Sequence, residues 1–139
     1  MTESEREEAR RWLDELTPIY ERNEAAIREI AGLNNESILQ DWDKAFSSNN
    51  VSALLTTVEP IKRLPKTKHK QLRKLKNDYS NLVADCLKAG YLYLKSYYAG
   101  DLSRLKLIRM VFWTSFAKSR LEDFIQRLQK VEQEIQTND

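Results

Sequence analysis

The sequence predicts an all-α fold, an elongated helical bundle with three long helices and about two short ones. The 139 residues include only three Gly and three Pro, while residues of high helix propensity such as Leu, Glu, Lys, Arg and Ala are abundant. Apolar residues recur at alternating spacings of three and four, which is the period of one helix face. No segment shows the pattern of a strand. We therefore expect a single helical domain over residues 1–139, without a recognisable C-terminal β domain.

The first long helix is predicted from about Thr2 or Ser4 to Ala31. Ser4 and Glu7 fit a capping box, in which each side chain accepts a hydrogen bond from the other residue's backbone N–H. Pro18 interrupts the pattern, since it either kinks the helix or ends it and starts another. The apolar stripe of this segment consists of Ala9, Leu13, Leu16, Tyr20, Asn23, Ile27 and Ile30.

Two short helices are predicted between Gly32 and Pro65. Asn34 and Asn35 can cap the first of them, and the polar residues 47–50 predict a turn by their composition. The second is expected to be interrupted or kinked near Pro60. The apolar residues are Ile38, Leu39, Trp42 and Phe46 in the first helix and Leu54, Leu55, Val58 and Ile61 in the second.

Two further long helices are predicted in the second half of the chain. Thr67 caps one that runs to about Ala99, and a break follows at Gly100, with Asp101 or Ser103 as the next cap. The last helix is expected over residues 105–136. The apolar stripes are Leu72, Leu75, Tyr79, Leu82, Cys86, Ala89, Tyr93 and Tyr97, followed by Phe112, Trp113, Phe116, Leu121, Phe124, Ile125, Leu128, Val131 and Ile135.

Positive charge is concentrated in the middle of the chain. Residues 62–120 contain fifteen Lys and Arg but only three acidic residues, whereas residues 1–61 have a net charge of −7 and residues 121–139 one of −3. Such asymmetry concerns partners and steering rather than fold. The densest run contains no acidic residue and comprises Lys62, Arg63, Lys66, Lys68, Lys70, Arg73, Lys74 and Lys76.

This basic run is compatible with three interpretations. It forms a plain solvated helix face, a salt-dependent contact with nucleic acid, or a contact with an acidic protein surface. No recognition-helix motif accompanies it, so the reading of a base sequence is not predicted.

The chain lacks the residues that most catalytic and metal sites require. Its one histidine, His69, lies in the basic run and is expected to be solvated. Its one cysteine, Cys86, lies on an apolar stripe and is expected to be buried. A single chain therefore offers no His-His-carboxylate or thiolate metal set, and no Gly-rich phosphate loop or nucleophile elbow is present. We predict no enzyme activity, no cofactor, and no catalytic, cofactor-binding or metal-binding residue.

The single cysteine and the acidic first residues indicate the cellular compartment. One cysteine forms no internal disulfide, and the acidic start Thr2-Glu3-Ser4-Glu5 is unlike a signal or transit peptide. No apolar run approaches the roughly 18 residues that span a bilayer. These features predict a cytosolic or nuclear protein without membrane contact.

Aromatic residues are more numerous near residues 91–116 than one helix face can bury. Core packing accounts for most of them, and the remainder suggests anchors in a protein–protein interface, where Tyr and Trp are enriched. The predicted interface residues are Tyr20, Tyr97, Tyr98 and Trp113.

Two stretches resemble the helical domain of GINS subunits, particularly the Psf-one and archaeal fifty-one-like branch. The first is LDELTPIYERN over residues 13–23, continuing to Ile27, and the second is WTSFAKSRLEDFI over residues 113–125. A basic segment followed by Tyr91-Leu92-Tyr93 lies between them in the order that the family shows. The likeness covers about 100 residues, and its individual motifs are of low specificity because amphipathic helices resemble one another.

The resemblance implies a non-catalytic structural subunit of a DNA-replication complex, which supports the MCM replicative helicase through helix-mediated assembly. The implied partners are the other subunits of a hetero-oligomer, the helicase and a RecJ-like protein, with DNA as a further partner. The implied location is nuclear in a eukaryote and cytoplasmic, at the nucleoid, in an archaeon. GINS subunits usually add a small β-rich domain. This sequence contains no segment that predicts such a domain, which is then either naturally absent or truncated.

Two other functions are compatible with the composition. One is a stand-alone basic helical protein that binds nucleic acid, of the chromatin or viral coat type. The other is a self-associating coiled-coil adaptor. Both are distinguished from the assembly subunit by experiment rather than by any motif in the sequence.

Overall fold

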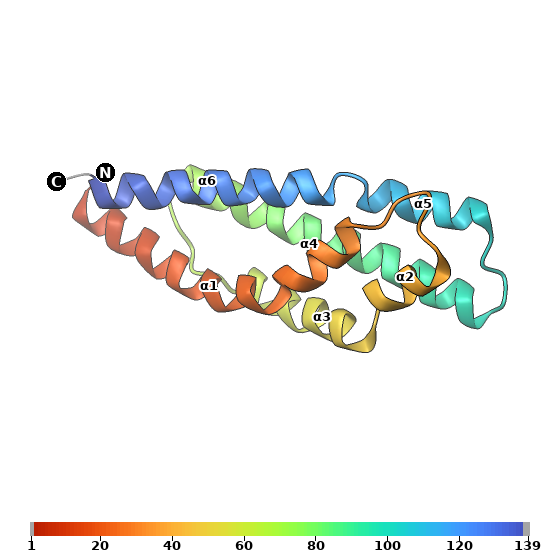
Figure 1. Cartoon of the computed structure of the whole chain (residues 1–139). Coiled ribbons are helices and arrows are strands. Elements are labelled where there is room, and N and C mark those ends of the chain that lie inside the picture. The colour runs from red at the N-terminus through yellow and green to blue at the C-terminus, as the bar shows by residue number, and fades with distance from the viewer. Residues whose placement is uncertain (1, 138–139) are drawn as a thin grey trace.

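The computed structural model describes residues 2–137, and over this range it confirms an all-α helical bundle without strands. The bundle is elongated, and α5 and α6 follow each other along one side of α4 (Figure 1). The start of α1 and the end of α6 lie at the same end of the molecule, whereas α5 lies toward the opposite end. The helices are α1 (Glu3–Ala31), α2 (Leu39–Ala45), α3 (Ser48–Lys62), α4 (Lys70–Tyr98), α5 (Arg104–Thr114) and α6 (Ala117–Thr137).

The first helix is continuous through Pro18. Its cap differs from the prediction, because the capping box is formed by Thr2 and Glu5 rather than by Ser4 and Glu7. Pro18 is tolerated since it lies on the exposed side of the helix. The carbonyl that loses its N–H partner there can be hydrogen-bonded by water.

The short helices begin at other residues than predicted. Ile38, not Asn34 or Asn35, is the N-cap of α2, while the Asn34 side chain accepts a hydrogen bond from the backbone N–H of Glu36 within the preceding loop. The expected turn at 47–50 is mostly helical, because the Ser47 hydroxyl accepts from the N–H of Asn50 and starts α3 there. The helix α3 passes through Pro60 and ends at Lys62, before Pro65.

The start of α4 and the division of the last helix also depart from the prediction. Thr67 accepts from the N–H of His69, and α4 begins at Lys70. Ser103 caps α5 as expected. The helix expected over residues 105–136 is divided between Thr114 and Ala117. At this point the Ser115 hydroxyl donates to the carbonyl of Phe112 at 2.9 Å, and such side-chain bonds compete with the helical backbone ladder.

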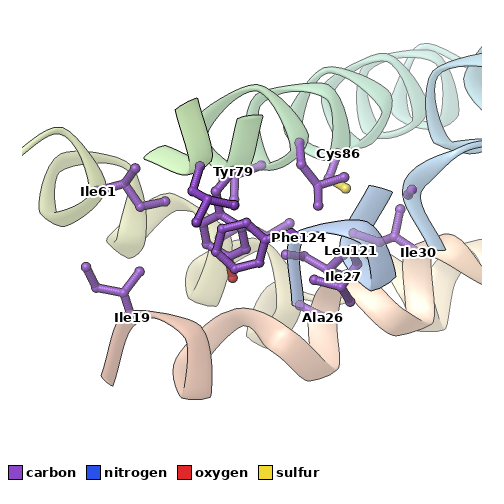
Figure 2. Packing of buried hydrophobic residues seen from close by; sticks show 14 of the residues in the cluster. Ile19, Ala26, Ile27, Ile30, Ile61, Tyr79, Cys86, Leu121 and Phe124 are labelled. Atoms are coloured by element: carbon purple, nitrogen blue, oxygen red, sulfur yellow. The ribbon is translucent and has the colours of Figure 1, made fainter. Parts of the chain in front are cut away.

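The core lies where α1, α3, α4 and α6 meet, and Tyr79 stacks on Phe124 at its centre with a centroid distance of 4.5 Å. Figure 2 shows these two rings beside Ile27 and Leu121. The predicted stripes are largely buried, but α1 buries a wider face than predicted because it contacts both α3 and α6. Trp12, Ile19 and Ala26 are therefore buried as well, while Leu13 and Tyr20 are only partly buried.

A polar cluster crosses this core. The Asn23 side chain on α1 donates to the Thr57 hydroxyl on α3 at 3.2 Å and accepts from the Tyr79 hydroxyl on α4. All three side chains are buried. Burial raises the pKa of Tyr79 above its ordinary value, so the phenol keeps the proton that it donates. The cluster fixes the register of the three helices, because any shift would leave buried polar groups without partners.

A second aromatic group holds α2 onto α4. Trp42, Phe46 and Tyr93 stack on one another with centroid distances of 5.8 to 6.1 Å, and the Tyr93 hydroxyl donates to the Asp43 carboxylate. The Phe46 ring approaches α4 closely at Gly90, where an added Cβ would lie 2.9 Å from Cδ1 of that ring. A glycine is required there by space and not by backbone conformation.

Candidate protein-interaction surface

The outer face of α5 is apolar and exposed. Leu105, Ile108 and Phe112 recur at i, i+3 and i+7 with exposed fractions of 69, 47 and 72 %, and Phe116 follows at 66 % just past the end of the helix. On the other side of α5, Met110 and Thr114 are fully buried. The helix is therefore apolar on two opposite faces, of which this chain covers only one. An apolar helix face normally packs against another element, so the uncovered face of α5 is of the kind that a partner covers.

This face corrects the predicted orientation of the last helix. Phe112 and Phe116 were expected on the apolar side that packs into the core, but the structure places them on the solvent side. The buried positions are instead Met110, Thr114 and Ala117. The signal was present in the sequence, because residues 105–113 hold seven large apolar side chains that no single face can accommodate.

The α4 end beside α5 adds exposed tyrosines. Tyr91 is 68 % exposed and Tyr98 is 82 % exposed. Tyr97, which was placed on the apolar stripe of this helix and also among the interface residues, is 43 % exposed. Tyr97 meets Tyr98 edge to face at a centroid distance of 5.6 Å. Tyr and Phe rings at this density are typical of interface anchors and rare on a free surface.

The four predicted interface residues do not form one cluster. Tyr97 and Tyr98 end α4, and Trp113 on α5 is partly buried. Tyr20 lies elsewhere: its ring is 6.4 Å from that of Tyr79, which the helical rise places roughly 27 Å along α4 from Tyr97. Burial raises the pKa of Tyr20. Tyr20 is thus partly buried against the central core, apart from the exposed aromatic residues of α4 and α5.

An open groove of about 590 Å³ lies between α3 and α4 and reaches α5. Its walls are apolar, and the only charged side chains among its lining residues are Lys62 and Lys88. Such a volume is within the range of ligand and peptide sites. The other lining residues are Val58, Ile61, Ser80, Val83, Ala84, Leu87, Tyr91, Leu92 and Trp113.

The basic run lies around the α3–α4 connection and the first turns of α4. Seven of its eight side chains are exposed, and Lys76 is half-buried with its Nζ donating to the carbonyl of Lys62 at 3.1 Å. Acidic residues of α1 and α6 lie beside it: the N–H of Lys68 donates to the Glu8 carboxylate, and Glu134 is 3.7 Å from Nε2 of His69. The acidic ends of the chain thus partly surround the basic run.

The one cysteine and the one histidine of the chain both have largely enclosed side chains. The Cys86 thiol is buried among apolar residues, and this burial raises its pKa to about 12. The thiol therefore stays protonated at neutral pH and is a poor nucleophile. Within residues 2–137 no group of three or more His, Cys, Asp and Glu side chains is placed to hold a metal ion. His69 is mostly buried, not solvated as expected, with a side chain only 16 % exposed.

No protein-family model, curated protein or solved structure matches this chain. In the described part of the chain, none of the helices combines the length and apolar content that crossing a membrane requires.

Proposed function

We propose that this chain is a non-catalytic subunit of a multi-protein assembly and that it binds a partner through the outer face of α5. The observation that carries the proposal is the exposure of Leu105, Ile108 and Phe112 on one face of a helix whose opposite face is fully buried. Transfer of this face from water into an interface is favourable at about 25 cal/mol per Å² of apolar surface. Interfaces of obligate complexes are enriched in such residues.

The specific assembly that we propose is a GINS-like replication complex, in which the chain supports the MCM helicase without taking part in its chemistry. The resemblance of residues 13–23 and 113–125 to GINS helical domains supports this proposal. The second stretch begins on α5 and continues into α6. It therefore includes Phe116, which belongs to the exposed aromatic surface.

The proposal is tested by co-expression with GINS-type subunits and with MCM helicase from the same organism. Light scattering measures the mass of the purified chain alone and with each partner. We expect a stable complex that the Ile108→Ser/Phe112→Ser double variant fails to form. Leu55→Ser is the matched control, since Leu55 is 57 % exposed on α3 and lies outside the α5 face. A chain that stays monomeric and recruits none of these proteins would contradict the replication role.

Binding of nucleic acid by the basic run is the second candidate function. It is favoured because Arg63, Lys66, Arg73 and Lys74 are exposed and form no ion pair within residues 2–137. A direct DNA contact loses affinity steeply with salt, because each neutralised phosphate releases counterions. Replacement of Lys68, Lys70, Arg73 and Lys74 by Ala should flatten this dependence. Absence of DNA binding at low salt would rule out this function.

A further inference from the structure

The groove between α3 and α4 has the shape of a site for one helix. Its α4 wall extends from Ser80 to Leu92, which corresponds to about 18 Å at the helical rise per residue, or roughly three turns. The small side chains Ser80 and Ala84 lie at one end, and the rings of Tyr91 and Trp113 lie at the other. An amphipathic helix in such a groove places apolar anchors at i, i+4 and i+7.

The two positive charges at the groove favour a partner helix that carries negative charge. Lys62 belongs to the α3 wall and Lys88 to the α4 wall, and no acidic side chain lines the groove. Both lysine side chains are well exposed, at 62 and 64 %, and the Nζ of each is 3.8 Å from a carboxylate oxygen on its own helix. Exposed ion pairs of this length contribute little free energy. Both cations are therefore available to a partner.

The pairing of Lys88 is further weakened by a competing cation. Its partner carboxylate, Asp85, accepts a hydrogen bond from Arg120 on α6 at 2.8 Å, through the oxygen other than the one nearest Lys88. The Asp85 charge is thus already compensated across the α4–α6 contact. A carboxylate arriving over the groove would meet Lys88 without having to displace a strong internal bond.

We propose that this groove binds an acidic amphipathic helix of a partner protein, with two or three apolar side chains between α3 and α4 and carboxylates at Lys62 and Lys88. The inference rests on the proposed assembly function and names the chemistry of one partner segment. The groove is separate from the outer face of α5, since none of Leu105, Ile108 and Phe112 lines it. The two surfaces can therefore be inactivated independently.

A second copy of this chain fits the groove less well than an acidic partner does. The exposed apolar segment that could be inserted from another copy is α5, and residues 102–121 contain five Lys and Arg without an acidic residue. Arg104 and Arg109 are exposed on this segment. Insertion would thus bring like charges together at Lys62 and Lys88, and such juxtaposition disfavours a pairing.

The test uses the full chain and a synthetic Ala-rich helical peptide of about 18 residues with Leu and Phe at i, i+4, i+7 and i+11 and Glu only at the positions beside these anchors. A peptide with Lys in place of Glu is its control. Binding is followed by the fluorescence anisotropy of the labelled peptide and by the emission of Trp113, the partly buried tryptophan of the groove. Trp12 and Trp42 are buried, and Trp113→Phe identifies their background signal.

Three variants locate the binding. Lys62→Glu/Lys88→Glu reverses the two groove charges and should weaken binding of the acidic peptide about tenfold or more while strengthening that of the basic peptide. Ala84→Gln places a larger polar side chain on the groove wall and should also weaken it. Lys66→Glu/Lys74→Glu makes the same change in net charge at two exposed residues outside the groove. This control should retain the affinity.

The inference is overturned if the acidic peptide does not bind, or binds equally well to the Lys62→Glu/Lys88→Glu variant. It is also overturned if the Lys66→Glu/Lys74→Glu control loses as much affinity, since the contact is then unspecific attraction to the basic run. Self-association that Ala84→Gln abolishes would assign the groove to a second copy. If the acidic peptide does not bind in the groove but a partner protein still binds through α5, the groove proposal fails and the proposed assembly function stands. If no partner protein binds through α5 but the acidic peptide still binds in the groove, the proposed assembly function fails and the groove site stands.

Discussion

The middle of the bundle and its α5 end differ in how completely they enclose apolar side chains. Around Tyr79 the rings and aliphatic chains of α1, α4 and α6 are buried, and Asn23 is hydrogen-bonded to both Thr57 and Tyr79. On α5 the exposed side chains Leu105, Ile108 and Phe112 are of the same chemical kind. Composition alone does not separate the two regions. The two regions differ in the number of helices that surround them. We therefore expect the enclosed region to contribute mainly to the stability of the fold and the exposed region to the binding of a partner.

The ion pairs follow the same division. Across the packed part, Arg120 meets Asp85 at 2.8 Å and Arg127 meets Asp78 at 2.7 Å, both between α6 and α4. On α5, Lys106 pairs with the nearby Asp101 at 2.7 Å, whereas the exposed Arg104 and Arg109 form no ion pair within the described residues 2–137. In the packed region, charged side chains of α6 are thus paired with carboxylates of α4. The outer side of α5 instead exposes both apolar side chains and cations without an ion pair within the described residues.

The largest expected effect comes from truncating matched phenylalanines in the two regions. Phe124→Ala removes a ring that is 2 % exposed and stacked on Tyr79, so we expect a loss of about 3–5 kcal/mol in the free energy of unfolding. Phe112→Ala removes a ring that is 72 % exposed, and its effect should stay within about 0.5 kcal/mol. Urea denaturation followed by circular dichroism measures both.

Equal losses at the two positions would break the comparison. In that case Phe112 would contribute to folding of the isolated chain, and the apolar outer face of α5 would be explained without a partner. A small loss at Phe124 with an unchanged denaturant slope would instead mean that the core near Tyr79 collapses around the missing ring. Both variants should be compared at the same protein concentration, because self-association adds to apparent stability.

The next effect is expected in the buried polar cluster. Asn23→Leu leaves the Tyr79 hydroxyl without its acceptor and should cost about 1–3 kcal/mol. The double variant Asn23→Leu/Tyr79→Phe removes both buried partners and should recover most of this loss. A double-mutant cycle from urea denaturation gives the coupling free energy. Additive losses would show that the two groups do not depend on each other in the folded protein.

A smaller effect is expected where α2 meets α4. Gly90→Ala gains about 1 kcal/mol of helix propensity, but the new Cβ would lie 2.9 Å from the buried Phe46 ring. Overpacking typically costs about 1–3 kcal/mol, so a net loss of about 1 kcal/mol is expected by thermal or urea unfolding. Shortening the neighbour in Gly90→Ala/Phe46→Leu should relieve the clash. Stabilisation by Gly90→Ala alone would show that α2 moves away without loss.

The sequence predicted the helices better than their ends. The stripes of α1 and α4 follow helical spacing over many turns, so residues such as Leu16, Leu75 and Leu82 are buried as expected. The division of the last helix was missed, because Ser115 is a minor perturbation in an otherwise strong helical pattern. Caps were misassigned at Ser4 and Asn34 since several adjacent polar residues could serve, and tertiary packing decides among them.

The candidate surface was only partly predictable. Spacing identifies which residues share a helix face, but not which of two apolar faces meets the rest of the chain. Phe112 and Phe116 were therefore placed on the apolar side of the last helix, with only an unspecified remainder of the aromatic residues expected in an interface. Leu105 and Ile108 were not singled out. Tyr98 and seven of the eight basic-run side chains are exposed, and their contact with a partner or with nucleic acid stays a prediction. The groove depends on three helices at once, and no local pattern in the sequence indicates it.

The smallest effect concerns the thiol of the packed region and its dependence on pH. Burial raises the pKa of Cys86 to about 12 from an ordinary 9.0, so the folded protein holds the thiol proton that the unfolded chain releases above pH 9. The contribution of this thiol to the free energy of unfolding is therefore fully present below about pH 9 and is lost as the pH rises toward 12. Between pH 8 and pH 10, wild type should lose about 1 kcal/mol more than Cys86→Ala, as measured by urea denaturation.

The same thiol offers a direct comparison with α5. In the native protein Cys86 should not react with a thiol reagent such as DTNB at pH 8, because its side chain is enclosed and protonated. A cysteine placed at the exposed position 108, as Ile108→Cys in a Cys86→Ala background, should react about as fast as an unfolded peptide. Protection of that second thiol in the isolated chain would mean that α5 is already covered by another copy. Protection that appears only when the partner is added would instead locate the interface on this face.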